Sequence, residues 1–189
     1  HSTVNIDNEN SSEVWSSFRV ARRARVYNRK QSVTKDEICL SACHDGYKRL
    51  SGSPIHSREW LFKNNSLIIT DWVTGSGKHT LSSVLPLYPH IEVVNQSSDS
   101  ALLKVCENEI FIEFEGDGDL SILNSEYHPE FGVSVNNNQL HYHMVSKLPN
   151  KILLSGQKGS GKATFAYHLI NYIFQGDPIM ELLLILMVT

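Results

Sequence analysis

Short segments rich in β-branched and aromatic residues, separated by closely spaced turn residues, run through most of this 189-residue chain. The clearest succession lies in residues 44–89, where residues 63–66 and 74–78 are expected to be turns because Asn and Gly tolerate positive φ. Before residue 150 we find no convincing 3.6-residue period. The pattern predicts a mainly β protein, an antiparallel β-sandwich of about a dozen short strands.

Charge is distributed unevenly along the chain, although the net charge is only −3. Six Arg and Lys residues crowd into residues 19–30, whereas residues 107–130 hold eight acids and no Lys or Arg. A basic face against an anionic polymer and ordinary solvated strand faces both fit this asymmetry. The composition as a whole gives no reason to expect a nucleic acid partner. Residues 179–188 are apolar but too few to span a bilayer, which needs about 20 residues, so no membrane span is expected.

The character of the sequence changes after Pro149. Residues 151–155 are a short apolar run, residues 156–162 are rich in glycine, and apolar residues then recur at helical spacing up to Phe174. Strand, glycine loop and helix in this order are the context of a P-loop. We therefore predict a sandwich over residues 1–147, followed by a separate strand–P-loop–helix fragment with an apolar tail over residues 148–189.

This second piece resembles the start of AAA-type ATPases of the clamp-loader delta-prime kind. The resemblance gives Gly156, Gly161 and Lys162 as nucleotide-binding candidates, with backbone amides around the phosphates and the lysine reaching the outer ones. Ala163 stands where a Ser or Thr should hold magnesium, so binding of ATP and magnesium is not expected of this fragment. An ATP-binding fragment of the DNA replication machinery is the alternative function.

Four motifs in the first piece occur in a characteristic order: residues 44–47 (His-Asp-Gly-Tyr), 56–58 (His-Ser-Arg), 71–79 and 87–89 (Leu-Tyr-Pro). Together they resemble the carboxy-terminal β-sandwich domain of heparinase II/III-like polysaccharide lyases, over about residues 1–147. The resemblance implies a parent enzyme that cleaves uronate-containing polysaccharides by β-elimination. It implies an acidic polysaccharide as the parent's partner and a periplasmic or secreted setting.

The catalytic residues of these lyases lie mainly in an α-toroid domain before the sandwich, so the resemblance carries no catalytic residue onto this chain. It implies a non-catalytic sandwich portion that is inactive alone. The family also holds zinc in the sandwich, and His1 matches one of the ligands. One imidazole cannot hold zinc, so we expect the intact parent, and not this chain, to bind it. The chain begins with His and not Met, from which we expect that its true amino terminus is missing.

Several polar residues of the first piece invite a functional interpretation. His56 and Arg58 share one face of a predicted strand and are candidates for contact with an acidic sugar. His44 and Tyr47 are three residues apart, which on a strand places them on opposite faces and favours a structural role. His141 and His143 share a strand face but have no visible third metal ligand.

Three local patterns are expected to be turns. The Gly-Ser-Gly-Lys segment at residues 75–78 resembles a phosphate loop but has strands on both sides, which indicates a hairpin turn. Residues 115–119 have the composition of a calcium loop without its spacing. The three asparagines at residues 136–138 are predicted to form a hairpin turn between two strands.

Overall fold

The computed structural model describes residues 2–16, 19–63 and 66–158, and every regular element in these ranges is a β-strand. The strands are β1 (Thr3–Ile6), β2 (Glu13–Ser16), β3 (Arg19–Arg22), β4 (Val26–Val33), β5 (Glu37–His44), β6 (Ile55–Lys63), β7 (Ser66–Thr74), β8 (Lys78–Pro86), β9 (Glu92–Gln96), β10 (Ser100–Val105), β11 (Asn108–Glu115), β12 (Asp119–Tyr127), β13 (Val135–Lys147) and β14 (Asn150–Lys158). No helix in these ranges has the length and apolar character that crossing a membrane requires.

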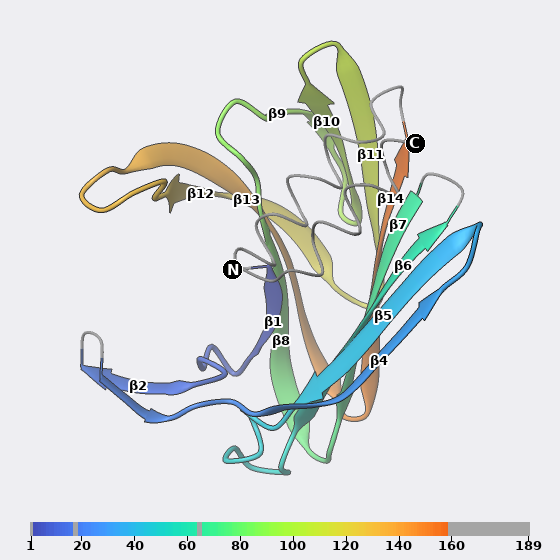
Figure 1. Ribbon diagram of the computed structural model, residues 1–189. Helices are drawn as coiled ribbons and strands as arrows, with labels where there is room; N and C mark the ends of the chain where they lie inside the picture. The colour runs from blue at the N-terminus through green and yellow to red at the C-terminus, as the bar shows by residue number, and fades with distance from the viewer. Residues whose placement is uncertain (1, 17–18, 64–65, 159–189) are drawn as a thin grey trace.

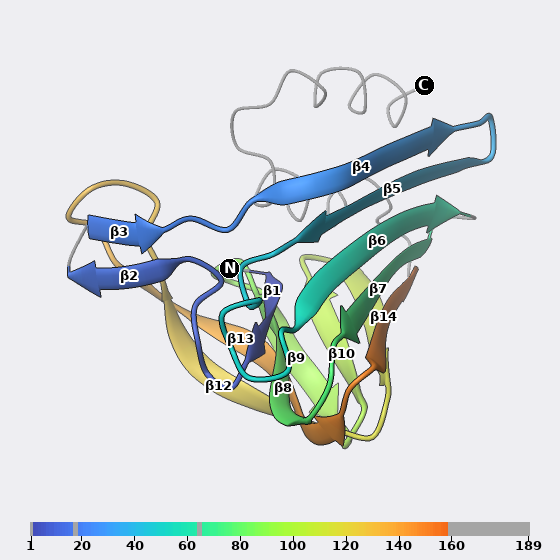
Figure 2. The same ribbon diagram turned by 90° about the horizontal axis from the view of Figure 1, so that it is seen from below.

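Two antiparallel sheets pack face to face (Figure 1). One has four strands in the order β1-β8-β13-β12, and the other has eight in the order β4-β5-β6-β7-β14-β11-β10-β9. A separate hairpin of β2 and β3 projects from the sandwich, and β3 leads into β4 along one side of the molecule (Figure 2). The predicted antiparallel β-sandwich is therefore confirmed.

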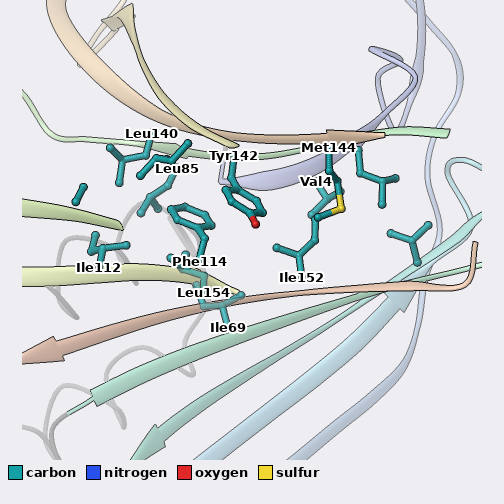
Figure 3. Close-up of a cluster of buried hydrophobic side chains, with 14 of the residues drawn as sticks. Val4, Ile69, Leu85, Ile112, Phe114, Leu140, Tyr142, Met144, Ile152 and Leu154 are labelled. Atoms are coloured by element: carbon teal, nitrogen blue, oxygen red, sulfur yellow. The ribbon is translucent and has the colours of Figure 1, made fainter. Parts of the chain in front are cut away.

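The core lies between the two sheets and follows from the alternation of apolar residues along the strands (Figure 3). In β13, Leu140, Tyr142 and Met144 are buried, while the residues between them face outward. From the opposite sheet, Phe114 of β11 stacks on Tyr142 with ring centroids 4.8 Å apart. Burial of each such side chain stabilises the fold by about 1.5–3 kcal/mol.

Strand β14 lies in the middle of the larger sheet, between β7 and β11. Its Leu154 is opposite Ile69 of β7 on one side and Phe114 of β11 on the other. The sandwich therefore continues to residue 158, whereas the predicted boundary after residue 147 separates β13 from β14. A central strand of a sheet and the strand before a P-loop both appear in a sequence as a short apolar run. The run alone therefore does not distinguish these two kinds of strand. The predicted helix and apolar tail lie outside the described residues.

The asparagines at residues 136–138 do not form the predicted hairpin turn. They lie inside β13 and are paired with residues 124–126 of β12, and the chain reverses instead at residues 128–134. Asn137 also donates a hydrogen bond from Nδ2 to the Leu87 carbonyl at 2.6 Å. Pairing with β12, together with this hydrogen bond to Leu87, overrides the local turn preference of asparagine.

Residues 75–77 are a turn, as predicted, but they do not close a hairpin. Strand β7 before them belongs to the eight-stranded sheet, and β8 after them belongs to the four-stranded sheet. Gly75 and Gly77 have φ values of 133° and 97°, which favour glycine. The turn therefore carries the chain from one layer of the sandwich to the other.

Candidate functional site

The predicted sugar-contact residues His56 and Arg58 lie on one face of β6, as expected, but this face points into the sandwich. Their exposed fractions are 3% and 7%. In the register of the sheet, Arg58 is opposite Asp71 of β7, and His56 is opposite His44 of β5. These four side chains form a buried polar cluster, which we call the Asp71 cluster.

Asp71 is the centre of this cluster and is 2% exposed. Arg58 donates two hydrogen bonds to its carboxylate, from Nε to Oδ1 at 2.6 Å and from Nη2 to Oδ2 at 2.8 Å. His56 Nε2 is 2.6 Å from the same Oδ1. Burial acts to raise the pKa of Asp71, but the positive charge of Arg58 and the hydrogen bonds from His56 and Arg58 outweigh it, so this pKa lies well below its ordinary value. Asp71 is an ionised partner that neutralises Arg58 inside the protein.

The two histidines extend the cluster as a chain of hydrogen bonds with one consistent direction. The Gly46 amide lies 3.2 Å from His44 Nδ1 and can only donate, so His44 Nδ1 accepts and His44 Nε2 carries the proton. That proton is donated to His56 Nδ1 at 3.0 Å, which leaves His56 Nε2 to donate to Asp71. This assignment requires a neutral His44. Burial is the largest cause that lowers the pKa of His44, to about 4, and it keeps this ring neutral.

The cluster also holds the amino-terminal strand against the larger sheet. Arg58 Nη1 donates to the Ser2 carbonyl at 2.8 Å, and the Tyr47 hydroxyl donates to the Val4 carbonyl at 2.9 Å. Tyr47 is fully buried, and burial raises its pKa to about 12. The predicted structural role of Tyr47 fits these contacts. The prediction that His44 and Tyr47 face opposite sides is wrong, since β5 ends at His44 and the two rings lie 5.5 Å apart.

A second polar link joins β8 to the residues that follow β1. His79 Nδ1 lies 2.7 Å from Asp7 Oδ2, and His79 Nε2 lies 3.0 Å from the Ser76 carbonyl. Both ring nitrogens thus face oxygens that only accept, which favours the imidazolium. Burial acts to lower the pKa of His79, but the hydrogen bonds to Asp7 and Ser76 raise it above its ordinary value. Asp7 also accepts a hydrogen bond from the Thr80 amide at 3.0 Å.

The part of the chain that the structure describes contains no complete metal site. There, no three His, Cys, Asp or Glu side chains come together in a way that could hold an ion. His141 and His143 do share the outer face of β13, with ring centroids 5.9 Å apart, and His143 Nδ1 lies 3.1 Å from the Ser82 hydroxyl. His1, the predicted zinc ligand, lies outside the described residues.

Of the three nucleotide-binding candidates, the structure describes only Gly156. Gly156 lies within β14, opposite Leu67 of β7 and Ile112 of β11, and not in a loop after the strand. Gly161 and Lys162 lie outside the described residues. Residues 116–118 form the turn between β11 and β12, as predicted for this segment with the composition of a calcium loop. Among the described residues, Gly156 thus belongs to a paired strand, and residues 116–118 belong to a turn.

Comparison with known proteins identifies the family of the chain. The sequence model of the family described as Heparinase II/III-like, C-terminal, matches residues 1–167. The chain belongs to this family. The match continues past the predicted boundary at residue 147, in agreement with the place of β14 in the sheet. A search of curated proteins found no match.

Solved structures of a heparan sulfate lyase and of heparinases III share the fold of this family member. The heparan sulfate lyase HepC from Pedobacter heparinus is 15% identical with a TM-score of 0.68, and covers 86% of this chain and 24% of its own. A heparinase III gene product is 16% identical with a TM-score of 0.67 and the same coverage. A further heparinase III is 13% identical with a TM-score of 0.66. The chain thus spans about a quarter of the length of these enzymes.

Sequence reasoning missed Asp71 as the buried partner of His56 and Arg58. Asp71 follows Leu67 and Ile69 in strict alternation, so it occupies a position where the pattern calls for an apolar, inward-facing residue. A carboxylate at such a position needs a cationic partner, and this was the available signal. Asp7 and His79 are 72 positions apart, and no local pattern connects them.

Proposed function

We propose that this chain is the non-catalytic β-sandwich portion of a longer polysaccharide lyase that cleaves uronate-containing polysaccharides by β-elimination. The observation that carries the proposal is the family match over residues 1–167. The heparan sulfate lyase and the heparinases III, whose sandwich this chain resembles, support an acidic polysaccharide as the substrate class.

The chemistry of β-elimination explains why the sandwich alone is expected to be inactive. A base must remove the C5 proton of a uronate while cationic or polar groups neutralise its carboxylate, and an acid must protonate the leaving oxygen. The buried His56 and Arg58 have their hydrogen-bonding groups engaged with Asp71, His44 and Ser2. These side chains support the fold of the sandwich, and the reacting groups would come from the rest of the longer protein.

The proposal includes a zinc ion that the longer protein binds, with His1 as one of the residues that coordinate it. Metal analysis of the purified longer protein is the direct test, and replacement of His1 by alanine is expected to lower its zinc content. Unchanged zinc in that variant would remove His1 from the ligand set. This readout does not depend on activity.

The proposed function is tested by expressing the complete reading frame that encodes this chain, next to the 189-residue chain itself. Both are incubated with heparan sulfate and with neutral dextran, and unsaturated uronate is followed by its ultraviolet absorbance. We expect product only from the longer protein and only with heparan sulfate. Product from the 189-residue chain would contradict the non-catalytic role, and no product from the longer protein on any uronate polysaccharide would refute the lyase assignment.

A further inference from the structure

One side of the molecule carries a concentration of positive charge, and the ion pairs among the described residues do not include it. Residues 13–35 contain seven Arg and Lys residues and a single acid, Glu13, in a chain whose net charge is −3. We call the surface formed by β2, β3 and β4 the basic ribbon. Its cations are Arg19, Arg22, Arg23, Arg25, Arg29, Lys30 and Lys35.

The hairpin at one end of this ribbon exposes apolar side chains together with the charges. Every described residue of β2 and β3 is exposed, and the two strands pair only with each other. Trp15 is 63% exposed, Val14 48% and Val20 38%. A two-stranded hairpin is only marginally stable alone in water, and exposed apolar groups rimmed by charge mark interaction sites. The hairpin therefore has the character of a surface that contacts a partner.

Trp15 and Arg19 form a pair suited to a charged sugar. The Arg19 guanidinium lies over the Trp15 ring, 5.4 Å from its centroid. An exposed indole offers a flat apolar surface to the C–H face of a pyranose ring. The guanidinium over one face of the ring presents a planar fork of N–H donors that matches carboxylate or sulfate oxygens. One sugar can thus stack on the opposite face of the indole, while the guanidinium binds the anionic group of a neighbouring sugar of the same polymer.

The shape of the ribbon suits a linear polymer. β3 leads into β4 along one side of the molecule (Figure 2), so the cations follow one extended path. At the rise of a β-strand, residues 19–33 span at most about 50 Å. Protection of a sheet edge by charged side chains would explain Arg29 and Lys30 on the edge strand β4. It does not explain the arginines and Trp15 of the hairpin, which is not an edge of either large sheet.

We propose that the basic ribbon binds the anionic polysaccharide directly, with Trp15 and Arg19 as its central contact and the other cations along β3 and β4 as further contacts. The inference takes the identity of the polymer from the proposed function. It concerns binding by this chain itself, and it requires no catalysis.

The experiment measures binding of the 189-residue chain to immobilised heparin, with neutral dextran and a short DNA duplex as comparison ligands. The test variant replaces Arg19, Arg22, Arg23 and Arg25 by glutamine. A matched control removes four charges elsewhere, at exposed lysines of β8, β10, β13 and β14: Lys78, Lys104, Lys147 and Lys151. We expect the ribbon variant to bind heparin about tenfold more weakly or worse, and the control to bind nearly as the original chain, with binding that falls as salt rises.

Single substitutions separate the aromatic contact from general charge attraction. Trp15→Ala is expected to weaken heparin binding several-fold, and Trp15→Phe to retain most of it, while thermal melting confirms that each variant is folded. Equal losses in the ribbon and control variants, DNA binding as tight as heparin binding, or no heparin binding at all would each overturn the inference. Elimination by the longer protein together with no heparin binding by this chain would refute the ribbon and leave the proposed function standing.

Discussion

Replacement of Asp71 by asparagine removes the anionic centre of the buried cluster with almost no change in side-chain volume. The Arg58 guanidinium would stay buried without its negative partner. An amide has one acceptor oxygen, so it can replace either the Oδ1 that His56 and Arg58 Nε share or the Oδ2 that accepts from Arg58 Nη2, and its NH2 group would face a donor at the other position. Breaking a buried ion pair in this way costs about 3–5 kcal/mol. Because domains are stable by only about 5–15 kcal/mol, this is a large part of the total.

Urea denaturation of the 189-residue chain measures this cost as a lower midpoint at unchanged slope. For a domain of this size the corresponding fall in melting temperature is about 6–20 °C. Glu37→Gln is the matched control in the same sheet, because it removes the exposed ion pair of Glu37 with Lys63, which is 3.0 Å long. Such exposed pairs contribute about 0.2–1 kcal/mol. If Asp71→Asn cost no more than this control, the structural role of the Asp71 cluster would be refuted.

Three further predictions concern His44, Asp7 and Gly46. The pKa of His44 is lowered from 6.5 to about 4 in the folded chain. As the pH falls through this window, the unfolded chain protonates His44 before the folded chain does, so the folded state loses stability. The melting temperature of His44→Gln should therefore depend less on pH between pH 4 and 6.5, and an unchanged dependence would contradict a neutral, buried His44. Asp7→Ala removes the acceptor of both His79 and Thr80 and is expected to cost about 1–3 kcal/mol in urea denaturation, whereas a cost near zero would rule out this link. In Gly46→Ala, the new Cβ would lie 2.4 Å from the Ser11 carbonyl oxygen, so we expect about 1–3 kcal/mol of destabilisation by thermal melting, and a neutral result would contradict this close approach.

The fold class could be read from the sequence because alternation and turn residues are local signals. The strands of residues 55–63 and 66–74 appear in the sequence as β-rich segments bounded by Pro, Asn and Gly. Pairing between distant segments is not a local signal. The position of β14 between β7 and β11 depends on contacts across 38 positions or more, whereas an apolar run followed by glycines resembles the start of a second unit when only its local sequence is considered.

The candidate site was predicted in part. The two-residue spacing of His56 and Arg58 correctly placed them on one face of a strand. Which face is buried depends on the register with β5 and β7, and that register brings His44 and Asp71 opposite them. The charge asymmetry of residues 19–30 was visible in the sequence, whereas the exposure of Trp15 beside Arg19 required the structure.

The most direct test of the account is the mass of the fragments that the longer protein releases from heparan sulfate. Elimination breaks the glycosidic bond without adding water and leaves a double bond in the uronate at the new non-reducing end. We predict fragments whose masses lack one water relative to hydrolysis products and whose appearance matches the rise in ultraviolet absorbance. Hydrated fragments without that absorbance, or intact heparan sulfate and other uronate polysaccharides after prolonged incubation, would contradict the assignment of this chain to a polysaccharide lyase.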